Sequence, residues 1–138
     1  QTKYTGPNMF EFGQIVALRD ENWTVFSGMD EQSIFAAMSG SSGHIGSTLN
    51  YMPGAYQKIR AHVKANEHAQ AMALQMRVNV VTRALIEAGF VGALYATMQI
   101  LGFDCGEPRL PGIALTEIAK AALRADLEVA GFWDLTAM

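Results

Sequence analysis

Two short stretches of the sequence carry side chains that could do chemistry: a lysine in TKYT at residues 2–5 and an acidic pair in FSGMDE at residues 26–31. A lysine amine that is kept unprotonated can attack a carbonyl carbon and form an imine. The carboxylates of Asp30 and Glu31 only accept hydrogen bonds, so they suit a ligand that is rich in hydroxyl groups. Each stretch also has a simpler interpretation, with Lys3 as a solvated charge and Asp30 as the N-cap of a helix whose first turn holds Glu31.

Other reactive side chains do not form a recognisable site. His44, His62 and His68 lack the spacing to a cysteine or carboxylate pair that a zinc site requires. GSSGHIGS at residues 40–47 is rich in glycine but lacks the lysine of a phosphate-binding loop. The single cysteine, Cys105, has no adjacent histidine or lysine, which favours an unreactive thiol. We therefore expect neither a metal nor another cofactor.

The first 66 residues read as three strand–helix units, because β-prone runs alternate with helical patterns at a regular spacing. The first unit joins the strand TKYT to a helix that Asn8 caps, and Glu11 stands three residues later as in a capping box. The second joins NWTVFSG to a helix that Asp30 caps and Gly40 ends. Strands that alternate with helices in this way pair in parallel through right-handed crossovers.

The third unit is the shortest. Its strand lies in GHI, with Ile45 as the expected buried residue, and Pro53 suits the first turn of the helix that follows. Lys3, the segment from Gly28 to Glu31, and the pair Gly46–Ser47 would then all stand at the carboxyl ends of parallel strands. Barrel enzymes built from β-α units keep their active sites at that end.

Residues 67–138 show no further strand pattern and read as a helical extension. A long helix ends at Gly89, and its wide apolar surface beside a narrow polar stripe predicts burial on more than one side. The polar stripe consists of His68, Gln75, Asn79 and Arg83. A second apolar helix, a loop with two prolines and a last helix capped by Thr116 follow.

Composition limits the class of protein. The chain has 138 residues, half of them hydrophobic, and a net charge of -3, so it can bury one core and has no electrostatic reason to bind nucleic acid or an anionic membrane. No apolar run reaches the roughly 18 residues that cross a bilayer. A lone cysteine and no visible signal segment favour the cytoplasm.

The predicted fold class is α/β: the last three β-α units of a (β/α)8 TIM barrel at residues 1–66, followed by a C-terminal helical extension at 67–138. A complete barrel needs about 250 residues, so the opening strand would be the sixth strand of a longer barrel. Three parallel strands alone also leave two unpaired edges. We therefore expect a missing N-terminal half-barrel or a second copy of the chain to complete the sheet.

Four motifs, in order and at the expected spacing, resemble the C-terminal part of the N-acetylneuraminate lyase and dihydrodipicolinate synthase superfamily. They are TKYT at 2–5, FSGMDE at 26–31, GHIGSTLNYMPG at 43–54 and LGFDCGEPRLP at 101–111. The motif sequences GMDE at 28–31 and IGSTLN at 45–50 resemble the lyase branch. The resemblance implies a class I aldolase that acts on pyruvate and sialic acid, in which Lys3 forms the Schiff base. It also implies that substrate is bound by Thr5, Gly28, Asp30, Glu31, Gly46 and Ser47.

The sequence departs from complete members of this superfamily, which are roughly twice as long, in keeping with a whole barrel. Their loop for the pyruvate carboxylate and their proton-relaying tyrosine lie on earlier strands. The resemblance therefore implies a C-terminal portion that is inactive without an N-terminal half and that belongs to a homo-oligomer. Two alternatives stay open: another pyruvate-dependent aldolase or dihydrodipicolinate synthase-like enzyme, and a non-catalytic barrel fragment that self-associates.

Overall fold

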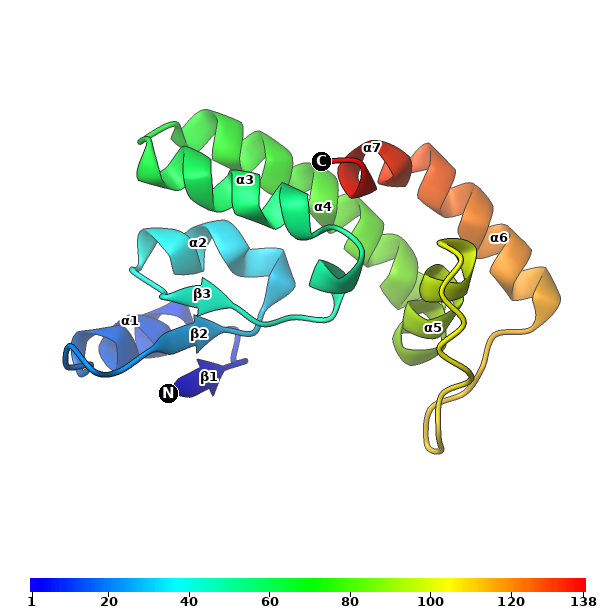
Figure 1. Cartoon of the computed structure of the whole chain (residues 1–138), viewed down its shortest axis with the longest axis horizontal. Helices are drawn as coiled ribbons and strands as arrows, with labels where there is room; N and C mark the ends of the chain where they lie inside the picture. Colours follow the sequence, from blue (N-terminus) through cyan, green and yellow to red (C-terminus); the bar gives the residue numbers. More distant parts are fainter.

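A three-stranded parallel sheet forms the first part of the molecule, which a computed structural model describes over residues 1–138 (Figure 1). The strand order is β1-β2-β3, with β1 at Thr2–Tyr4, β2 at Val25–Ser27 and β3 at Gly43–His44. In the register of the sheet, Lys3 pairs with Phe26, and Phe26 pairs with Gly43. The parallel pairing confirms the α/β class predicted from the alternating pattern.

Helical segments follow each strand in turn. They are α1 (Met9–Ala17) after β1, η1 (Asp30–Gln32) and α2 (Ser33–Met38) after β2, and η2 (Thr48–Asn50) and α3 (Pro53–Lys64) after β3. Asn8 caps α1 as predicted, since its side chain accepts hydrogen bonds from the first-turn amides. The capping box is incomplete, because the Glu11 carboxylate accepts a hydrogen bond from the Tyr4 hydroxyl at 2.7 Å instead of from the Asn8 amide.

Two predictions about these units are wrong. Ile45 is 45% exposed, and the buried side chain of the third strand is that of His44. Successive side chains along a strand point to opposite faces, so His44, which pairs with Ser27, turns toward the helices and Ile45 turns away. Asp30 does not cap the helix after β2: the N-cap of η1 is Met29, without a side-chain hydrogen bond, and the Asp30 carboxylate turns inward.

Four helices make up the rest of the chain: α4 (His68–Glu87), α5 (Phe90–Ile100), α6 (Glu117–Val129) and α7 (Phe132–Thr136). Thr116 caps α6 as predicted, by accepting a hydrogen bond from the Ala119 amide at 3.2 Å. The sequence pattern did not indicate α7. No single helix is long and apolar enough to cross a membrane; α4 and α5 meet that test of length and composition only as a pair bent by 114°.

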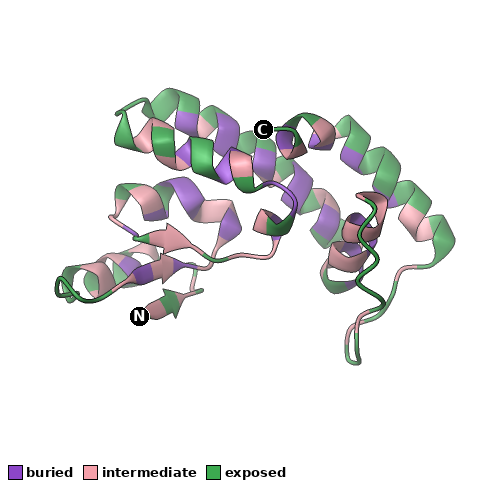
Figure 2. Cartoon of the chain, in the orientation of Figure 1, coloured by how far each residue is buried: buried purple, intermediate pink, exposed green.

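The main hydrophobic core joins the strand–helix units to the later helices. It is one cluster of 17 buried side chains that runs from Ile34 to Leu135, and Figure 2 shows buried positions along α3 and α4. The cluster includes Ile59 of α3, Val81 of α4 and Leu127 of α6. Apolar burial on this scale is the main free-energy term that holds helices together. The helices after residue 66 are therefore fixed firmly against the β-α units.

The two faces of the sheet differ in what covers them. On one face, Val25 forms a small second core with Phe12 of α1 and Ala36 of α2. Tyr4 belongs to the same face, and its ring centroid lies 5.8 Å from that of Phe12. Because side chains alternate along a strand, Lys3 points to the opposite face, where it is exposed.

Candidate active site

Lys3, Thr5 and Gly28 meet at the carboxyl end of the sheet. A Cβ atom on Gly28 would collide with Cε of Lys3 and with Oγ1 of Thr5 in their present positions, so a glycine at residue 28 leaves room for both side chains. The Gly28 amide donates a hydrogen bond to the Tyr4 carbonyl at 2.8 Å, which extends the pairing of β1 with β2. The amine of Lys3 takes part in none of the five ion pairs of the chain and is accessible to a ligand.

Asp30 lies at the centre of a buried hydrogen-bond network. Its Oδ2 accepts hydrogen bonds from the amide and the hydroxyl of Thr48, at 2.8 and 2.7 Å, and its Oδ1 lies 3.0 Å from Nε2 of His44. The Thr48 hydroxyl also lies 2.6 Å from that of Tyr56, whose ring stacks on His44. Burial raises the pKa of the Asp30 carboxyl, but the hydrogen bonds from His44 and Thr48 outweigh burial and hold the pKa below its usual value. A charged carboxylate therefore ties the loop after β2 to the loop after β3.

Gly46 allows these two loops to approach each other. A Cβ atom at this position would collide with the carboxylate of Asp30. The next residue, Ser47, precedes η2, and its carbonyl accepts a hydrogen bond from the Asn50 side chain at 2.9 Å. The pair Gly46–Ser47 is thus placed directly beside the Asp30 network.

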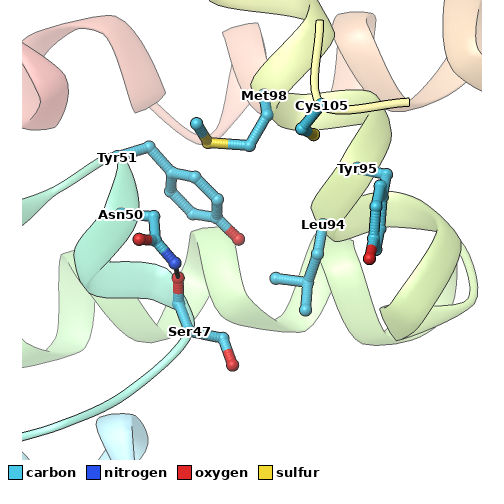
Figure 3. A pocket seen from close by; sticks show the side chains of 7 residues that line it. All are labelled: Ser47, Asn50, Tyr51, Leu94, Tyr95, Met98 and Cys105. Carbon is cyan, nitrogen blue, oxygen red and sulfur yellow. Dashed lines mark hydrogen bonds between the residues drawn. The ribbon is translucent and has the colours of Figure 1, made fainter. Parts of the chain in front are cut away.

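A cleft of about 370 Å³ lies next to Ser47, between η2 and α5 (Figure 3). It is lined by Ser47, Asn50, Tyr51, Leu94, Tyr95, Met98 and Cys105. The Tyr51 hydroxyl is buried, has no hydrogen-bond partner in the chain and points across the cleft (Figure 3). Burial raises the pKa of Tyr51 far above its usual value, so the hydroxyl keeps its proton.

Glu31 differs from its neighbour Asp30, because its carboxylate makes no hydrogen bond or ion pair within the chain. The residue is half-buried, and its backbone carbonyl accepts a hydrogen bond from the Asn79 side chain at 3.2 Å. The carbonyl of Asp30 accepts one from the Gln75 side chain at 3.1 Å. The sequence pattern indicates neither contact, because Gln75 and Asn79 fall on a polar stripe of their own helix.

The structure therefore places every predicted site residue at the carboxyl ends of the strands or in the loops that follow them. Lys3 and Thr5 both lie against Gly28, and Asp30 lies against Gly46. Glu31 and Ser47 are adjacent in sequence to Asp30 and Gly46. The part that each residue plays in binding a substrate stays a prediction. Sequence reasoning missed Tyr51, because an isolated tyrosine just before a helix is equally typical of a core residue.

Comparison with known proteins identifies the family to which the chain belongs. Residues 2–130 match the model of the dihydrodipicolinate synthetase family. The chain belongs to this family. The match confirms the resemblance carried by the four sequence motifs.

Individual relatives of this dihydrodipicolinate synthetase family member include two kinds of enzyme. The chain is 29% identical to mouse N-acetylneuraminate lyase over 133 residues, which are 94% of this chain and 42% of the mouse protein. It is 27% identical over 108 residues to the 2-dehydro-3-deoxy-phosphogluconate/2-dehydro-3-deoxy-6-phosphogalactonate aldolase of Sulfurisphaera tokodaii, covering 78% of this chain and 37% of that enzyme.

The fold matches solved structures of the same family. The structure of Proteus mirabilis N-acetylneuraminate lyase is similar with a TM-score of 0.86 and 29% identity, over 94% of this chain and 44% of that one. The chain thus spans less than half the length of its relatives and matches their C-terminal part. Its structural neighbours are TIM-barrel aldolases, so its fold fits part of such a barrel.

Proposed function

We propose that this chain supplies the Schiff-base lysine and the substrate-tail loops of a class I aldolase of the N-acetylneuraminate lyase type, which cleaves sialic acid to pyruvate and N-acetylmannosamine. The observation that carries the proposal is the position of Lys3, which is exposed at the carboxyl end of the sheet beside Thr5 and Gly28. In the proposed barrel, β1, β2 and β3 are the sixth, seventh and eighth strands. The face that carries Lys3 then lines the barrel interior.

The proposed chemistry begins at the amine of Lys3. The amine forms a carbon–nitrogen bond to the keto carbon of the substrate, and water leaves. A base takes the proton of the substrate hydroxyl, the carbon–carbon bond breaks, and its electron pair passes to the protonated imine, which releases N-acetylmannosamine as the aldehyde and leaves an enamine on Lys3. Protonation of the enamine carbon and addition of water to the resulting imine then release pyruvate and restore the amine. Groups that bind the pyruvate carboxylate and relay the proton come, in this proposal, from the strands that precede β1, so the chain acts with an N-terminal half and within an oligomer. The cytoplasm is the proposed location.

The hydroxyl-rich tail of the substrate is held by the loops after β2 and β3. Glu31 has a carboxylate without a partner in the chain, and a carboxylate can accept hydrogen bonds from two hydroxyls. Ser47 and Tyr51 line the adjacent cleft, into which the tail extends. Asp30 is already bonded through both oxygens, so it acts mainly by holding Thr48 in place. Its direct contact with substrate stays a prediction.

Two alternatives have support of their own. The match to the Sulfurisphaera tokodaii enzyme favours an aldolase that uses Lys3 in the same way on a different sugar acid. The unpaired outer edges of β1 and β3 favour a non-catalytic fragment that self-associates.

Pyruvate release distinguishes these possibilities. The chain is combined with the N-terminal portion of a related lyase and offered N-acetylneuraminate or 2-dehydro-3-deoxy-phosphogluconate. We expect faster release from N-acetylneuraminate, loss of release in Lys3→Ala, and full release in the control Lys64→Ala, since Lys64 is exposed at the end of α3. Faster release from 2-dehydro-3-deoxy-phosphogluconate would favour the other aldolase, and release from neither would favour the non-catalytic fragment.

A further inference from the structure

Two polar residues of α4 hold the backbone on both sides of Glu31. Nε2 of Gln75 donates to the Asp30 carbonyl at 3.1 Å, and its Oε1 accepts a hydrogen bond from the Ile34 amide at 2.9 Å. Nδ2 of Asn79 donates to the Glu31 carbonyl at 3.2 Å, and its Oδ1 accepts from Gln75 at 2.8 Å. The two side chains, one turn apart on α4, thus bind three backbone groups of residues 30–34.

Gln75 is an unusual residue for its position, because it is only 1% exposed within a helix whose other buried positions are mostly apolar. A buried amide costs free energy unless its groups are hydrogen-bonded, and an apolar side chain would carry no such cost. The bonds of Gln75 go mainly to the backbone of the loop after β2. Gln75 therefore fixes the backbone of residues 30–34 in addition to filling space in the core.

The contacts determine the direction in which the Glu31 side chain leaves the backbone. The carbonyls of Asp30 and Glu31 belong to the two planar peptide units that meet at the Glu31 Cα atom. When both peptide planes are held, the direction of the Cα–Cβ bond is held as well. The carboxylate of Glu31 has no partner in the chain, so the held Cα–Cβ direction limits the region that the carboxylate can reach by rotation about its side-chain bonds.

We propose that Gln75 and Asn79 are positioning residues that aim the Glu31 carboxylate at the hydroxyl-rich tail of the substrate. This inference rests on the proposed function. It gives α4, a helix of the predicted extension, a part in substrate affinity that acts through Glu31. The loop is held from two directions, by α4 through its backbone and by Thr48 through the Asp30 carboxylate.

The first test uses the chain as it is. In Gln75→Leu the Ile34 amide loses its acceptor, and we expect its hydrogen exchange to become at least about tenfold faster. The matched control is Gln70→Leu, because Gln70 lies on the same helix and is exposed. Unchanged exchange at Ile34, or an equal change in Gln70→Leu, would overturn the inference.

The second test uses the chain combined with the N-terminal portion of a related lyase. Asn79→Ala is the main variant, since Asn79 is only partly buried and its removal leaves the core intact. We expect a roughly tenfold higher KM for N-acetylneuraminate, with unchanged borohydride labelling of Lys3 by pyruvate. The KM should recover in Asn79→Gln, which keeps an amide donor, and should stay high in Asn79→Asp, whose carboxylate cannot donate to the Glu31 carbonyl. For Gln75→Leu we likewise expect a higher KM for N-acetylneuraminate and unchanged labelling of Lys3.

The outcomes separate this inference from the proposed function. An unchanged KM in Asn79→Ala, or a loss of pyruvate labelling that parallels the loss of sugar cleavage, means that these residues are only structural and overturns the inference. A parent protein that fails to label Lys3 overturns the proposed function, and with it the substrate role of Gln75 and Asn79. Faster exchange at Ile34 in that case would mark their contacts as structural alone.

Discussion

Oδ2 of Asp30 accepts two hydrogen bonds from a single residue, Thr48, one from the amide at 2.8 Å and one from the hydroxyl at 2.7 Å. Thr48 begins η2, so this pair sets how the loop after β2 lies against the loop after β3. These are the two loops that we propose to hold the substrate tail. The geometry of the two loops therefore depends on this charged group.

The Asp30 carboxyl should make the fold sensitive to acid. Burial raises its pKa, but hydrogen bonds from His44 and Thr48 bring the pKa below the usual value of about 3.9. A lowered pKa in the folded state contributes stability that is present above the unfolded pKa and is lost as the pH falls through the folded pKa. The difference in free energy of unfolding between the parent and Asp30→Asn should be large near pH 7 and shrink below about pH 4.

Urea unfolding at several pH values measures this difference. Asp126→Asn is the control, because Asp126 is exposed on α6 and should behave like the parent at every pH. An Asp30→Asn deficit that stays the same at low and neutral pH would contradict the assignment.

The Thr48 hydroxyl should matter more than its methyl group. Thr48 is fully buried, and its hydroxyl contacts both Asp30 and Tyr56. Thr48→Val keeps the shape but removes those contacts, and we expect a loss of about 1–3 kcal/mol in the free energy of unfolding. Thr48→Ser keeps the hydroxyl and should lose less. Denaturation midpoints that rank the serine variant below the valine variant would show that packing dominates.

Two buried tyrosines provide a matched comparison. The Tyr56 hydroxyl is bonded to Thr48, whereas the Tyr51 hydroxyl has no partner in the chain. Tyr56→Phe should therefore destabilise the fold by about 1 kcal/mol, while Tyr51→Phe should be neutral or slightly stabilising. Thermal unfolding of both variants checks this. Equal losses would contradict the absence of a hydrogen-bond partner for the Tyr51 hydroxyl.

Helix starts and ends could be predicted from the sequence where a single capping residue or glycine marks them. Asn8 and Thr116 cap their helices, and Gly40 and Gly89 follow helix ends with positive φ angles of 89° and 97°. Glycine adopts such angles without the steric cost that other residues carry, so its position is informative from sequence alone. The five-residue helix α7 has too little periodicity to be detected.

Contacts between distant residues could not be predicted in the same way. An aspartate ahead of a helical pattern is typical of an N-cap, and nothing local indicates that Asp30 instead bonds to His44 and Thr48, 14 and 18 residues away. A polar stripe on a helix is typical of a solvent-facing side. Periodicity does not reveal that Gln75 and Asn79 meet the backbone of another loop.

The open sheet should drive association. β1 and β3 each have one unpaired edge, and Lys3 and Thr5 are exposed at the face that a complete barrel would enclose. Unpaired strand edges readily take up another strand, so we expect the chain to form an oligomer or to bind the N-terminal portion of a related lyase. Sedimentation over a range of concentrations tests this. A chain that stays monomeric throughout, with and without that portion, would contradict it.

The Glu31 carboxylate should affect the sugar tail without affecting the reaction centre. In the completed barrel, Glu31→Gln removes a charged acceptor, and we expect use of N-acetylneuraminate to weaken by about 1–3 kcal/mol. Condensation with pyruvate alone should persist, because pyruvate has no tail to bind. Steady-state kinetics and pyruvate trapping measured on the same samples make the comparison, and equal losses in both would mark Glu31 as structural.

Borohydride trapping of pyruvate at Lys3 tests the central claim most directly. Borohydride reduces an imine to a stable amine, and peptide mapping then locates the added mass. With the N-terminal portion supplied, the barrel surrounds Lys3 and orients pyruvate, so we expect labelling at Lys3 in preference to Lys58, Lys64 and Lys120, and no labelling in Lys3→Ala. The chain alone should show little selective labelling. Indiscriminate labelling of the lysines in the completed barrel, or full labelling after Lys3→Ala, would contradict the assignment of Lys3 as the Schiff-base residue.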